Sequence, residues 1–231
     1  MDGYVIPWVY IGIAPFYNSP MIPVVITAAG HSHRYGQNKL WLLRDGLPLI
    51  AHTIACFTSH RATLRGPIAL VVSSEDWAPM QVLAKQYGVI LIPGGATRSQ
   101  SVNNGLKWAL THSPLGVLVH DGARPFVSLD LIQRMMADPH LPMAIPGLPV
   151  SDTIKEVVDH RVVRTLPRES LRAIQTPQYI RADVAHRLVA STMDATDEAG
   201  VAEQLGVTVT VLEGERPNLK VTWPGDWPGD G

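Results

Sequence analysis

A loop that follows the first predicted strand carries residue types suited to phosphate chemistry. It runs Ala28-Ala29-Gly30-His31-Ser32-His33-Arg34-Tyr35-Gly36-Gln37-Asn38-Lys39. Small residues such as Ala28, Ala29 and Gly30 let the backbone approach a ligand, and backbone N–H groups can bind phosphate oxygens. Arg34 and Lys39 add positive charge. The loop lacks the ending of a P-loop and the glycine spacing of a dinucleotide fingerprint, so taken alone it favours a plain strand-to-helix turn slightly over a phosphate site.

Two more polar clusters follow later strands of the predicted sheet. They are Gly94-Gly95-Ala96-Thr97-Arg98-Ser99-Gln100-Ser101 and His120-Asp121-Gly122-Ala123-Arg124-Pro125. The first is a glycine turn that leads into a helix, with Ser99 as its expected cap. In the second, an Asp three residues before an Arg is typical of a metal or phosphate position, and equally of a local ion pair. Ligands of parallel α/β sheets bind at the carboxyl ends of strands, so we expect these clusters to meet at one edge.

Several loops that bear glycine or a cation at one sheet edge indicate a highly anionic ligand. A nucleoside triphosphate that meets a phosphate monoester is such a ligand pair. Transfer between them requires in-line positioning, a divalent metal ion and cations around the charge-rich transition state. The candidate cations are Arg34, Lys39, Arg168 and Lys220. Loss of one preorganised donor in such a site costs about 3 to 4 kcal/mol of transition-state stabilisation.

The segments that must position these loops alternate between apolar strands and helices. Strands are predicted at 22–27, 68–72, 89–92 and 116–120, and helices at 48–58, 78–87, 99–111 and 129–136. This alternation favours an α/β fold with a mostly parallel sheet covered by helices on both faces. Residues 153–176 alternate short β-like stretches with charges, as a projecting arm does. A helix at 182–191 and strands at 207–211 and 219–222 follow, and the last nine residues have a turn-like composition.

Composition bounds the remaining classes of function. The chain has 231 residues, of which 46% are hydrophobic and 17% charged, and its formal net charge is −1. It can therefore bury a sizeable core, and we expect no nucleic-acid partner. No stretch approaches the ~20 apolar residues of a membrane span, so we expect no membrane partner. The lone cysteine, Cys56, lies in an apolar stretch, which predicts a core thiol and suits a reducing, cytoplasmic location.

The first twenty residues stand apart from this pattern. They contain three prolines and lack a basic start, so they do not match a signal peptide. We assign residues 1–20 to an N-terminal extension without a predicted role, and residues 21–231 to a single domain.

The motifs, taken in order, resemble one known family. They are Ala28-Ala29-Gly30 with Arg34, Gly94-Gly95 with Arg98, Ser101, Val102 and Gly105-Leu106, His120 to Pro125, Asp152-Thr153-Ile154-Lys155, Gln175-Thr176-Pro177-Gln178, Ala195 to Ala199, and Asn218 to Thr222. From about residue 22 to 222, they resemble the 2-C-methyl-D-erythritol 4-phosphate cytidylyltransferases of the non-mevalonate isoprenoid pathway. The resemblance implies a Rossmann-like nucleotidyltransferase fold with a projecting β-arm. It also implies that the chain joins CTP to that sugar-alcohol phosphate with the help of Mg²⁺ or another divalent cation, releasing pyrophosphate.

The resemblance also implies a role for each matching residue. Arg34 and Lys39 would stabilise the pentavalent α-phosphorus, and Arg168 and Lys220 would hold the acceptor phosphate. The implied nucleotide contacts are Ala28, Ala29, Gly30, Gly95, Arg98 and Ser101. The implied acceptor-site residues are Asp121, Arg124, Thr153 and Thr176, with Asp121 near the metal-bound phosphates. The arm at 153–176 resembles a dimerisation arm, which implies a homodimer in which Arg168 and Thr153 act in the site of the partner subunit.

Five features depart from the family's pattern. Ser32 stands where a glycine is usual, and Asn38 stands where a proline usually precedes the lysine. The stretch between Gly36 and Lys39 is about two residues shorter than usual. Gly122 replaces a common alanine. Relatives usually continue into a closing helix beyond the position of Thr222, the last residue of the matching segment.

Two other functions lie close to this one. A sister family transfers cytidylyl groups to D-ribitol 5-phosphate, but its members tend to carry a bulkier residue at the position of Ala123. They also carry a glycine where Ile174 stands, so the sequence favours the methylerythritol phosphate. A nucleotide-binding module without activity would be consistent with Ser32 and the shortened loop.

A metal-dependent hydrolase is a third alternative. It would use His31, His33 and His120 with Asp121, although this set shows no recognised third-ligand spacing. Two structural alternatives concern single motifs. Arg98 can brace its own loop instead of binding a nucleotide, and the acids at 197–198 suit the first turn of a helix capped by Thr196.

Overall fold

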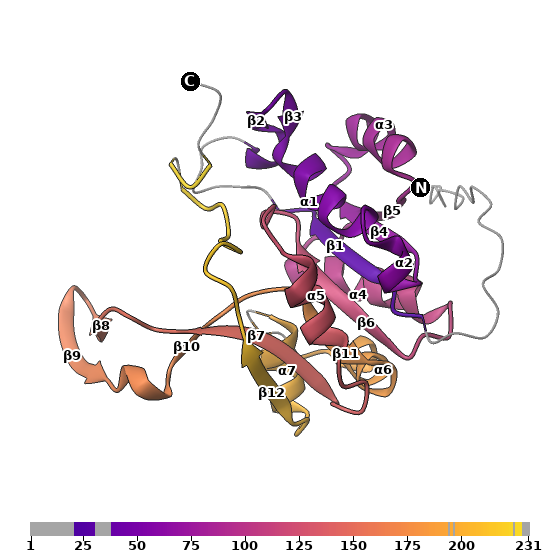
Figure 1. Cartoon of the computed structure of the whole chain (residues 1–231). Helices are drawn as coiled ribbons and strands as arrows, with labels where there is room; N and C mark the ends of the chain where they lie inside the picture. The colour runs from indigo at the N-terminus through magenta and orange to yellow at the C-terminus, as the bar shows by residue number, and fades with distance from the viewer. Residues whose placement is uncertain (1–20, 31–37, 194, 196, 224, 228–231) are drawn as a thin grey trace, which may run out of the picture.

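A mostly parallel sheet of eight strands forms the centre of the protein in a computed structural model, which describes residues 21–30, 38–193, 195, 197–223 and 225–227 (Figure 1). The strands are β1 Val24–Ala28, β4 Ile68–Val72, β5 Ile90–Pro93, β6 Gly116–Asp121, β7 Met143–Pro149, β10 Arg172–Ile174, β11 Gln178–Arg181 and β12 Val209–Glu213. Their order is β10-β7-β11-β6-β1-β4-β5, and β12 pairs with β7. Strands β10 and β11 run antiparallel to their neighbours, and the other pairs are parallel.

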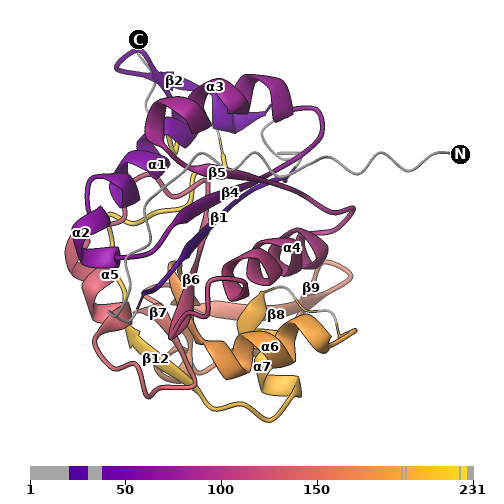
Figure 2. The same cartoon turned by 90° about the vertical axis from the view of Figure 1, so that its right-hand side faces the viewer.

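Helices cover both faces of this sheet, as the sequence predicted (Figure 2). They are α1 Leu49–Thr58, α2 Arg61–Leu64, α3 Trp77–Tyr87, α4 Arg98–Leu110, α5 Leu129–Met136, α6 Ala182–Ala190 and α7 Glu198–Gln204. Helices α1, α3 and α5 share one apolar core with Ile26 and Leu70, whereas α4, α6 and α7 share another with Val25 and Val71. Side chains alternate along a strand, so both faces of these strands must be apolar to be covered.

Gly105 allows α4 to lie close against β1. A Cβ atom at this position would lie 2.3 Å from Val25 Cγ1, whose side chain is fully buried. A larger residue would therefore push the helix away from the sheet. The close packing fixes the start of α4, Arg98, near the carboxyl end of β1.

The carboxyl ends of β1, β4, β5 and β6 lie at one edge of the sheet. The register pairs Thr27 of β1 with Asp121 of β6 and with Val71 of β4. It also pairs Val72 of β4 with Pro93 of β5. The polar clusters that follow β1, β5 and β6 therefore begin side by side, which is the arrangement that the sequence predicted.

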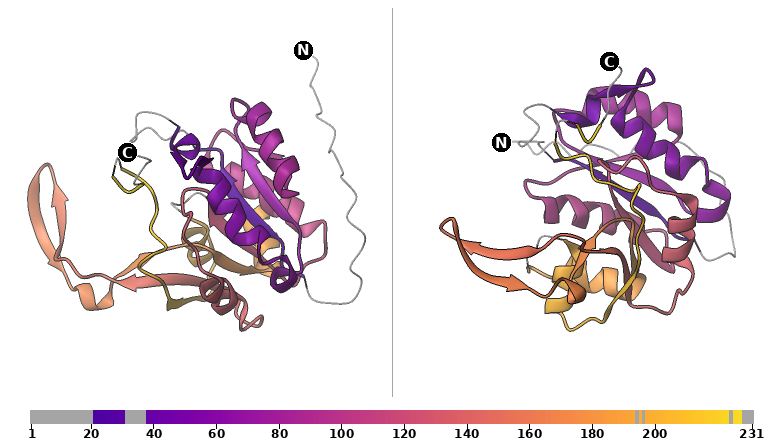
Figure 3. Two further views of the ribbon diagram at one scale, coloured as in Figure 1. Left: turned by 45° about the horizontal axis from the view of Figure 1, so that its top comes forward. Right: turned by 60° about the vertical axis from the view of Figure 1, so that its left-hand side comes forward.

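A β-hairpin projects from the body of the protein (Figures 1 and 3). It consists of the antiparallel strands β8 Ile154–Val158 and β9 Arg161–Leu166, and a short 3-10 helix, Arg168–Ser170, follows it. Four valines on the hairpin, at 157, 158, 162 and 163, are between 52% and 61% exposed. The predicted arm is therefore present, although its last residues return to the main sheet as β10.

Two sequence predictions at the level of elements are wrong. Residues 219–222 form no strand, although the Val221 N–H donates to the Ala123 carbonyl oxygen at 2.9 Å. The cap of α4 is Thr97, whose side chain accepts from the Gln100 N–H, and not Ser99. The sequence pattern also did not predict β7, because Pro146 and its neighbouring glycine disfavour a central strand. Nor did it predict β11 or the short hairpin of β2 Leu43–Arg44 with β3 Leu47–Pro48.

Two expectations from composition, a packed cysteine and no membrane span, can be compared with the described residues. Cys56 is half-buried, its thiol donates to the Pro125 carbonyl oxygen at 3.3 Å, and burial raises its pKa to about 11. It is therefore a packed thiol and not an activated nucleophile. No helix within the described ranges combines the length and the apolar character that a bilayer span requires.

Candidate active site

A cavity of about 400 Å³ opens at the carboxyl edge of the sheet. Its walls come from the three loops that the sequence identified, represented by Gly30 after β1, Gly95 after β5 and Gly122 after β6. Lys39, at the end of the first of these loops, lines it as well, and so does Lys220, from the motif at 218–222. A cavity of this size suits a small-molecule ligand, and the basic residues on its wall favour an anionic one.

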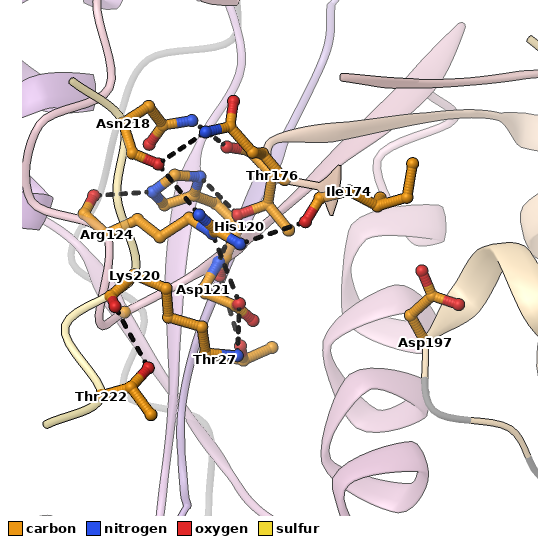
Figure 4. Close-up of polar contacts among 12 residues, drawn as sticks. Thr27, His120, Asp121, Arg124, Ile174, Thr176, Asp197, Asn218, Lys220 and Thr222 are labelled. Atoms are coloured by element: carbon orange, nitrogen blue, oxygen red, sulfur yellow. Dashed lines mark hydrogen bonds and ion pairs between the residues drawn. The ribbon is translucent and has the colours of Figure 1, made fainter. Parts of the chain in front are cut away.

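Asp121 and Lys220 form an ion pair in this cavity (Figure 4). Lys220 Nζ lies 2.8 Å from Asp121 Oδ2, and Arg124 Nε lies 3.7 Å from the same oxygen. Burial by itself would raise the pKa of Asp121. The charges of Lys220, Arg98 and Arg124, together with the hydrogen bond from Lys220, outweigh burial and hold this pKa well below its usual range. The carboxylate therefore stays ionised and is a poor proton acceptor.

A chain of buried hydrogen bonds holds the backbone of Asp121 from behind (Figure 4). The Asp121 N–H donates to Thr176 Oγ1 at 3.0 Å, and Thr176 Oγ1 lies 3.0 Å from His120 Nδ1. His120 Nε2 lies 3.0 Å from the Arg124 carbonyl oxygen, so this nitrogen is the donor and Nδ1 accepts from Thr176. Burial lowers the pKa of His120 to about 4, which keeps the ring neutral. The turn from Asp121 to Arg124 is thereby fixed.

The same network fixes the segment that carries Lys220. Arg124 Nη1 donates to the Asn218 carbonyl oxygen at 2.9 Å, and Arg124 Nη2 donates to the Ile174 carbonyl oxygen at 3.3 Å. Gln175 Nε2 also donates to the Asn218 carbonyl at 3.0 Å, and Asn218 Nδ2 donates to the Thr176 carbonyl at 2.8 Å. Arg124 and Thr176 are buried and do not line the cavity, so they shape it from behind.

Asn218 and Gln175 received no role from the sequence alone. Both are buried polar side chains, at 0% and 5% exposure, that bond to backbone groups far away in the sequence. The available signal was their position inside two of the matching motifs. The sequence alone does not show which distant backbone carbonyl a polar side chain will bind in the folded protein.

The glycine turn after β5 is braced by its own side chains. Ser101 Oγ accepts from the Gly95 N–H at 3.0 Å and donates to the Thr97 carbonyl oxygen at 2.9 Å. A Cβ atom on Gly95 would lie 2.3 Å from Gln100 Cβ, so the turn requires glycine there. The cavity wall formed by Gly95 and Ser101 is therefore braced by hydrogen bonds within the turn itself.

Arg98 lines the cavity and also pairs with Glu198 of α7. Its two terminal nitrogens lie 2.7 Å and 3.0 Å from the two carboxylate oxygens. The Glu198 side chain is 6% exposed and that of Arg98 is 37% exposed. Burial raises the pKa of Glu198, and the charge of Arg98 opposes that shift. Arg98 thus joins α4 to α7. The cap of α7 is Asp197, whose side chain accepts from the Gly200 N–H. The cap expected from the sequence, Thr196, lies outside the described residues.

Lys39 reaches the cavity from the 3-10 helix η2, Lys39–Trp41, and is held there by Asn38. The Asn38 side chain accepts from the Leu40 N–H and donates to Asp76 Oδ2 at 2.8 Å. Trp41 Nε1 donates to the other oxygen of Asp76, also at 2.8 Å. Asn38 therefore anchors this segment to the start of α3. Arg34, the other cation predicted for the nucleotide, lies outside the described residues.

Comparison with known proteins decides the family. A model of 2-C-methyl-D-erythritol 4-phosphate cytidylyltransferase matches residues 22–228, almost the whole chain. The chain belongs to this cytidylyltransferase family. The enzyme of that name from Bacillus licheniformis is 39% identical over 214 residues, which cover 88% of this chain and 91% of the relative. The one from Frankia casuarinae is 39% identical over 215 residues, covering 90% of this chain and 79% of the relative.

Solved structures of the same cytidylyltransferase family share the fold. The crystal structure from Thermus thermophilus is 33% identical with a TM-score of 0.73, and covers 89% of this chain and 95% of its own. The crystal structure of 4-diphosphocytidyl-2C-methyl-D-erythritol synthase from Anaerococcus prevotii is 28% identical with a TM-score of 0.76, covering 90% and 92%. The α/β fold predicted from the sequence is thereby confirmed.

Two residues predicted for the cytidylyltransferase site lie away from the cavity of their own chain. Arg168 is exposed beside the arm, and its Nη1 donates to the Ser151 carbonyl oxygen at 2.6 Å. Thr153 is exposed at the base of the same arm. Neither lines the cavity that contains Asp121, so a single chain does not bring them to it.

The hydrolase alternative loses its central ligand. Both ring nitrogens of His120 are engaged, with Thr176 and with the Arg124 carbonyl, so the ring is not available to a metal. His31 and His33 lie outside the described residues. In the described part of the chain, no three His, Cys, Asp or Glu side chains gather as a metal site would require.

We predict that Glu198→Ala destabilises the fold, because it leaves the guanidinium of Arg98 without its partner. Since Arg98 is partly exposed, we expect a loss of about 2 kcal/mol in the free energy of unfolding, below the range for fully buried pairs. Urea denaturation measures it. Glu198→Gln should lose less, and Glu203→Ala, an exposed change in the same helix, should stay within about 0.5 kcal/mol of the wild type. Equal stability of the Glu198→Ala and Glu203→Ala variants would contradict a stabilising pair.

Proposed function

We propose that this chain transfers the cytidylyl group of CTP to 2-C-methyl-D-erythritol 4-phosphate, in the synthesis of isoprenoid precursors. The products are 4-diphosphocytidyl-2-C-methyl-D-erythritol and pyrophosphate. The observation that carries the proposal is the Asp121–Lys220 pair at the cavity edge, in a chain whose family bears that activity as its name.

The nucleotide would occupy the side of the cavity between the first loop and the start of α4. Gly30 lines this side, and a Cβ atom at its position would meet no atom of the described residues within 4 Å. The braced turn at Gly95 and the N-terminus of α4 favour an anion on the same side. Lys39 and Arg98 contribute positive charge to this wall. These features support a triphosphate as the ligand.

The acceptor would bind at Lys220, on the other side of the cavity. An oxygen of its phosphate attacks the α-phosphorus of CTP and forms a new P–O bond, while the bond from that phosphorus to the β-phosphate breaks and pyrophosphate leaves. The attacking oxygen is already anionic, so the step requires no general base. This agrees with an Asp121 whose lowered pKa makes it a poor base and whose contacts make it a holder of Lys220.

We also propose a divalent cation, with Mg²⁺ as the first choice. Asp121 supplies the one carboxylate among the described residues that line the cavity. Mg²⁺ is commonly held by one or two carboxylates together with substrate phosphates and water, so this donor set fits it. When bound, the ion would offset the negative charge of the phosphates.

The substrate assignment is tested by pyrophosphate release from CTP and Mg²⁺, with 2-C-methyl-D-erythritol 4-phosphate and D-ribitol 5-phosphate in parallel. We expect release with the first acceptor. Lys220→Ala should lower kcat/KM by about 10²- to 10³-fold because a preorganised cation is lost. Lys107→Ala, an exposed change on α4 outside the cavity, serves as the control. Release with the second acceptor alone would contradict the acceptor, and no release from folded, CTP-binding protein would favour the inactive module.

The arm supports a further proposal, a homodimer in which Arg168 and Thr153 act in the partner's site. The cytoplasmic location is proposed from the composition alone, with its single cysteine. An isolated two-stranded hairpin is only marginally stable, and this one exposes apolar valines on both strands. A second copy that packs on the arm would cover them. It would also explain why Arg168 lies away from the cavity of its own chain.

We predict that Val157→Lys and Val162→Lys, which change one cross-strand pair of the arm, dissociate the dimer because they place charge in the interface. Analytical ultracentrifugation measures the dissociation, and Val82→Lys on α3, where the residue is 68% exposed, is the matched control.

If Arg168 acts in the partner's site, a mixture of Arg168→Ala and Lys220→Ala chains should regain activity that neither has alone. A wild-type monomer, or a mixture without activity, would refute this arrangement.

A further inference from the structure

The segment that carries Lys220 has few backbone bonds of its own. It belongs to no strand, and its main tie to the sheet is the Val221 N–H, which donates to the Ala123 carbonyl oxygen at 2.9 Å. Upstream of Lys220, Arg124 and Gln175 hold the Asn218 carbonyl. The position of Lys220 therefore depends on side-chain contacts on both sides of it.

The downstream contacts begin with Asp226. Its Oδ2 atom accepts from the N–H groups of Thr222 and Trp223, both at 2.8 Å. These two bonds lower the pKa of Asp226, and the charge of Lys39 lowers it further. Thr222 itself lines the cavity, so the turn closed by Asp226 begins at the cavity wall.

Trp227 anchors this turn to the body of the protein. Its side chain is 4% exposed, whereas that of Trp223 is 55% exposed. The ring of Trp227 packs edge-on against His52 of α1, with centroids 5.3 Å apart, and in a tilted arrangement against Phe126 at 5.6 Å. The Arg44 guanidinium carbon lies 5.4 Å from the Trp227 ring centroid. The tryptophan is thus held between α1, strand β2 and the turn after β6.

We propose that Asp226 and Trp227 are positioning residues that hold Lys220 against Asp121. Together with Thr222 and Trp223 they form a turn that we call the C-terminal clasp. Trp227 fixes the far end of the clasp, Asp226 closes it, and Lys220 is held between the clasp and the Asn218 contacts. Neither residue touches the reacting groups.

The proposal predicts two separate effects of losing the clasp, one on the position of Lys220 and one on catalysis. The position of Lys220 is a property of the protein itself. The effect on catalysis rests on the cytidylyl transfer proposed above, in which Lys220 holds the acceptor phosphate. A loosened Lys220 should raise the KM for the acceptor, with a smaller change in the KM for CTP.

The experiment uses the full chain with Trp227→Ala and Asp226→Ala, and Val82→Ala, a change at an exposed position of α3 outside the clasp and the cavity, as the control. Acetylation of lysines by acetic anhydride, followed by mass spectrometry, reports how well Asp121 protects the Lys220 amine, and Lys107 is the internal reference. We expect Lys220 to react several-fold faster in both clasp variants and at the wild-type rate in the control. The acceptor KM should rise about tenfold or more in both variants. Asp226→Asn, which keeps an acceptor oxygen for the two N–H groups, should restore both values.

Unchanged acetylation of Lys220 in both clasp variants would overturn the proposal, even if their melting temperatures fall. Faster acetylation without a change in acceptor KM would overturn the catalytic part of it. If Trp227→Ala does not fold, the Asp226→Ala variant tests the proposal by itself. Asp226 is only half-buried, so we expect this variant to fold. If the wild type transfers no cytidylyl group, the proposed function fails, and the acetylation rates alone decide on the clasp.

Discussion

The pairing of Asp121 with Lys220 is the interaction on which the rest of the site depends. Asp121 ends β6 and is buried, and a buried carboxylate costs several kcal/mol unless an opposite charge lies beside it. Lys220 provides that charge at 2.8 Å, from a segment almost a hundred residues further along the chain. Among the cations that compensate the carboxylate, Lys220 makes the shortest contact, so the pair holds its segment at the sheet edge, and the cavity lies beside them.

The buried groups around this pair are arranged to keep it in place. His120 is neutral and bridges Thr176 to the Arg124 carbonyl, and Arg124 in turn holds the Asn218 carbonyl. Polar groups in a low-dielectric interior are costly when they are left unpaired, so such a network tolerates little movement. A site that transfers a charged phosphoryl group benefits from cations fixed in advance, because no reorganisation is then needed during the reaction.

The part of this arrangement that local pattern encodes could be predicted from the sequence. Continuous apolar strands gave the parallel sheet, and the glycine turn at Gly95 lies where the pattern placed it. The parts that depend on distant pairs could not be predicted from local pattern. Residues 219–222 have strand-like composition but lie beside β6 without joining it. Glu198 looked like the start of a helix and is also the partner of Arg98, a hundred residues away.

The most direct test of this account is a double-mutant cycle of Asp121→Asn and Lys220→Gln, with kcat/KM for the acceptor as the measured quantity. If Asp121 acts by holding Lys220, its loss should cost more in the wild type than in the Lys220→Gln background, where only its contact with the proposed cation remains to be lost. We predict a coupling free energy of about 1 to 3 kcal/mol between the two positions. Additive losses, with Asp121→Asn costing the same in both backgrounds, would contradict the claim that the pair organises the site.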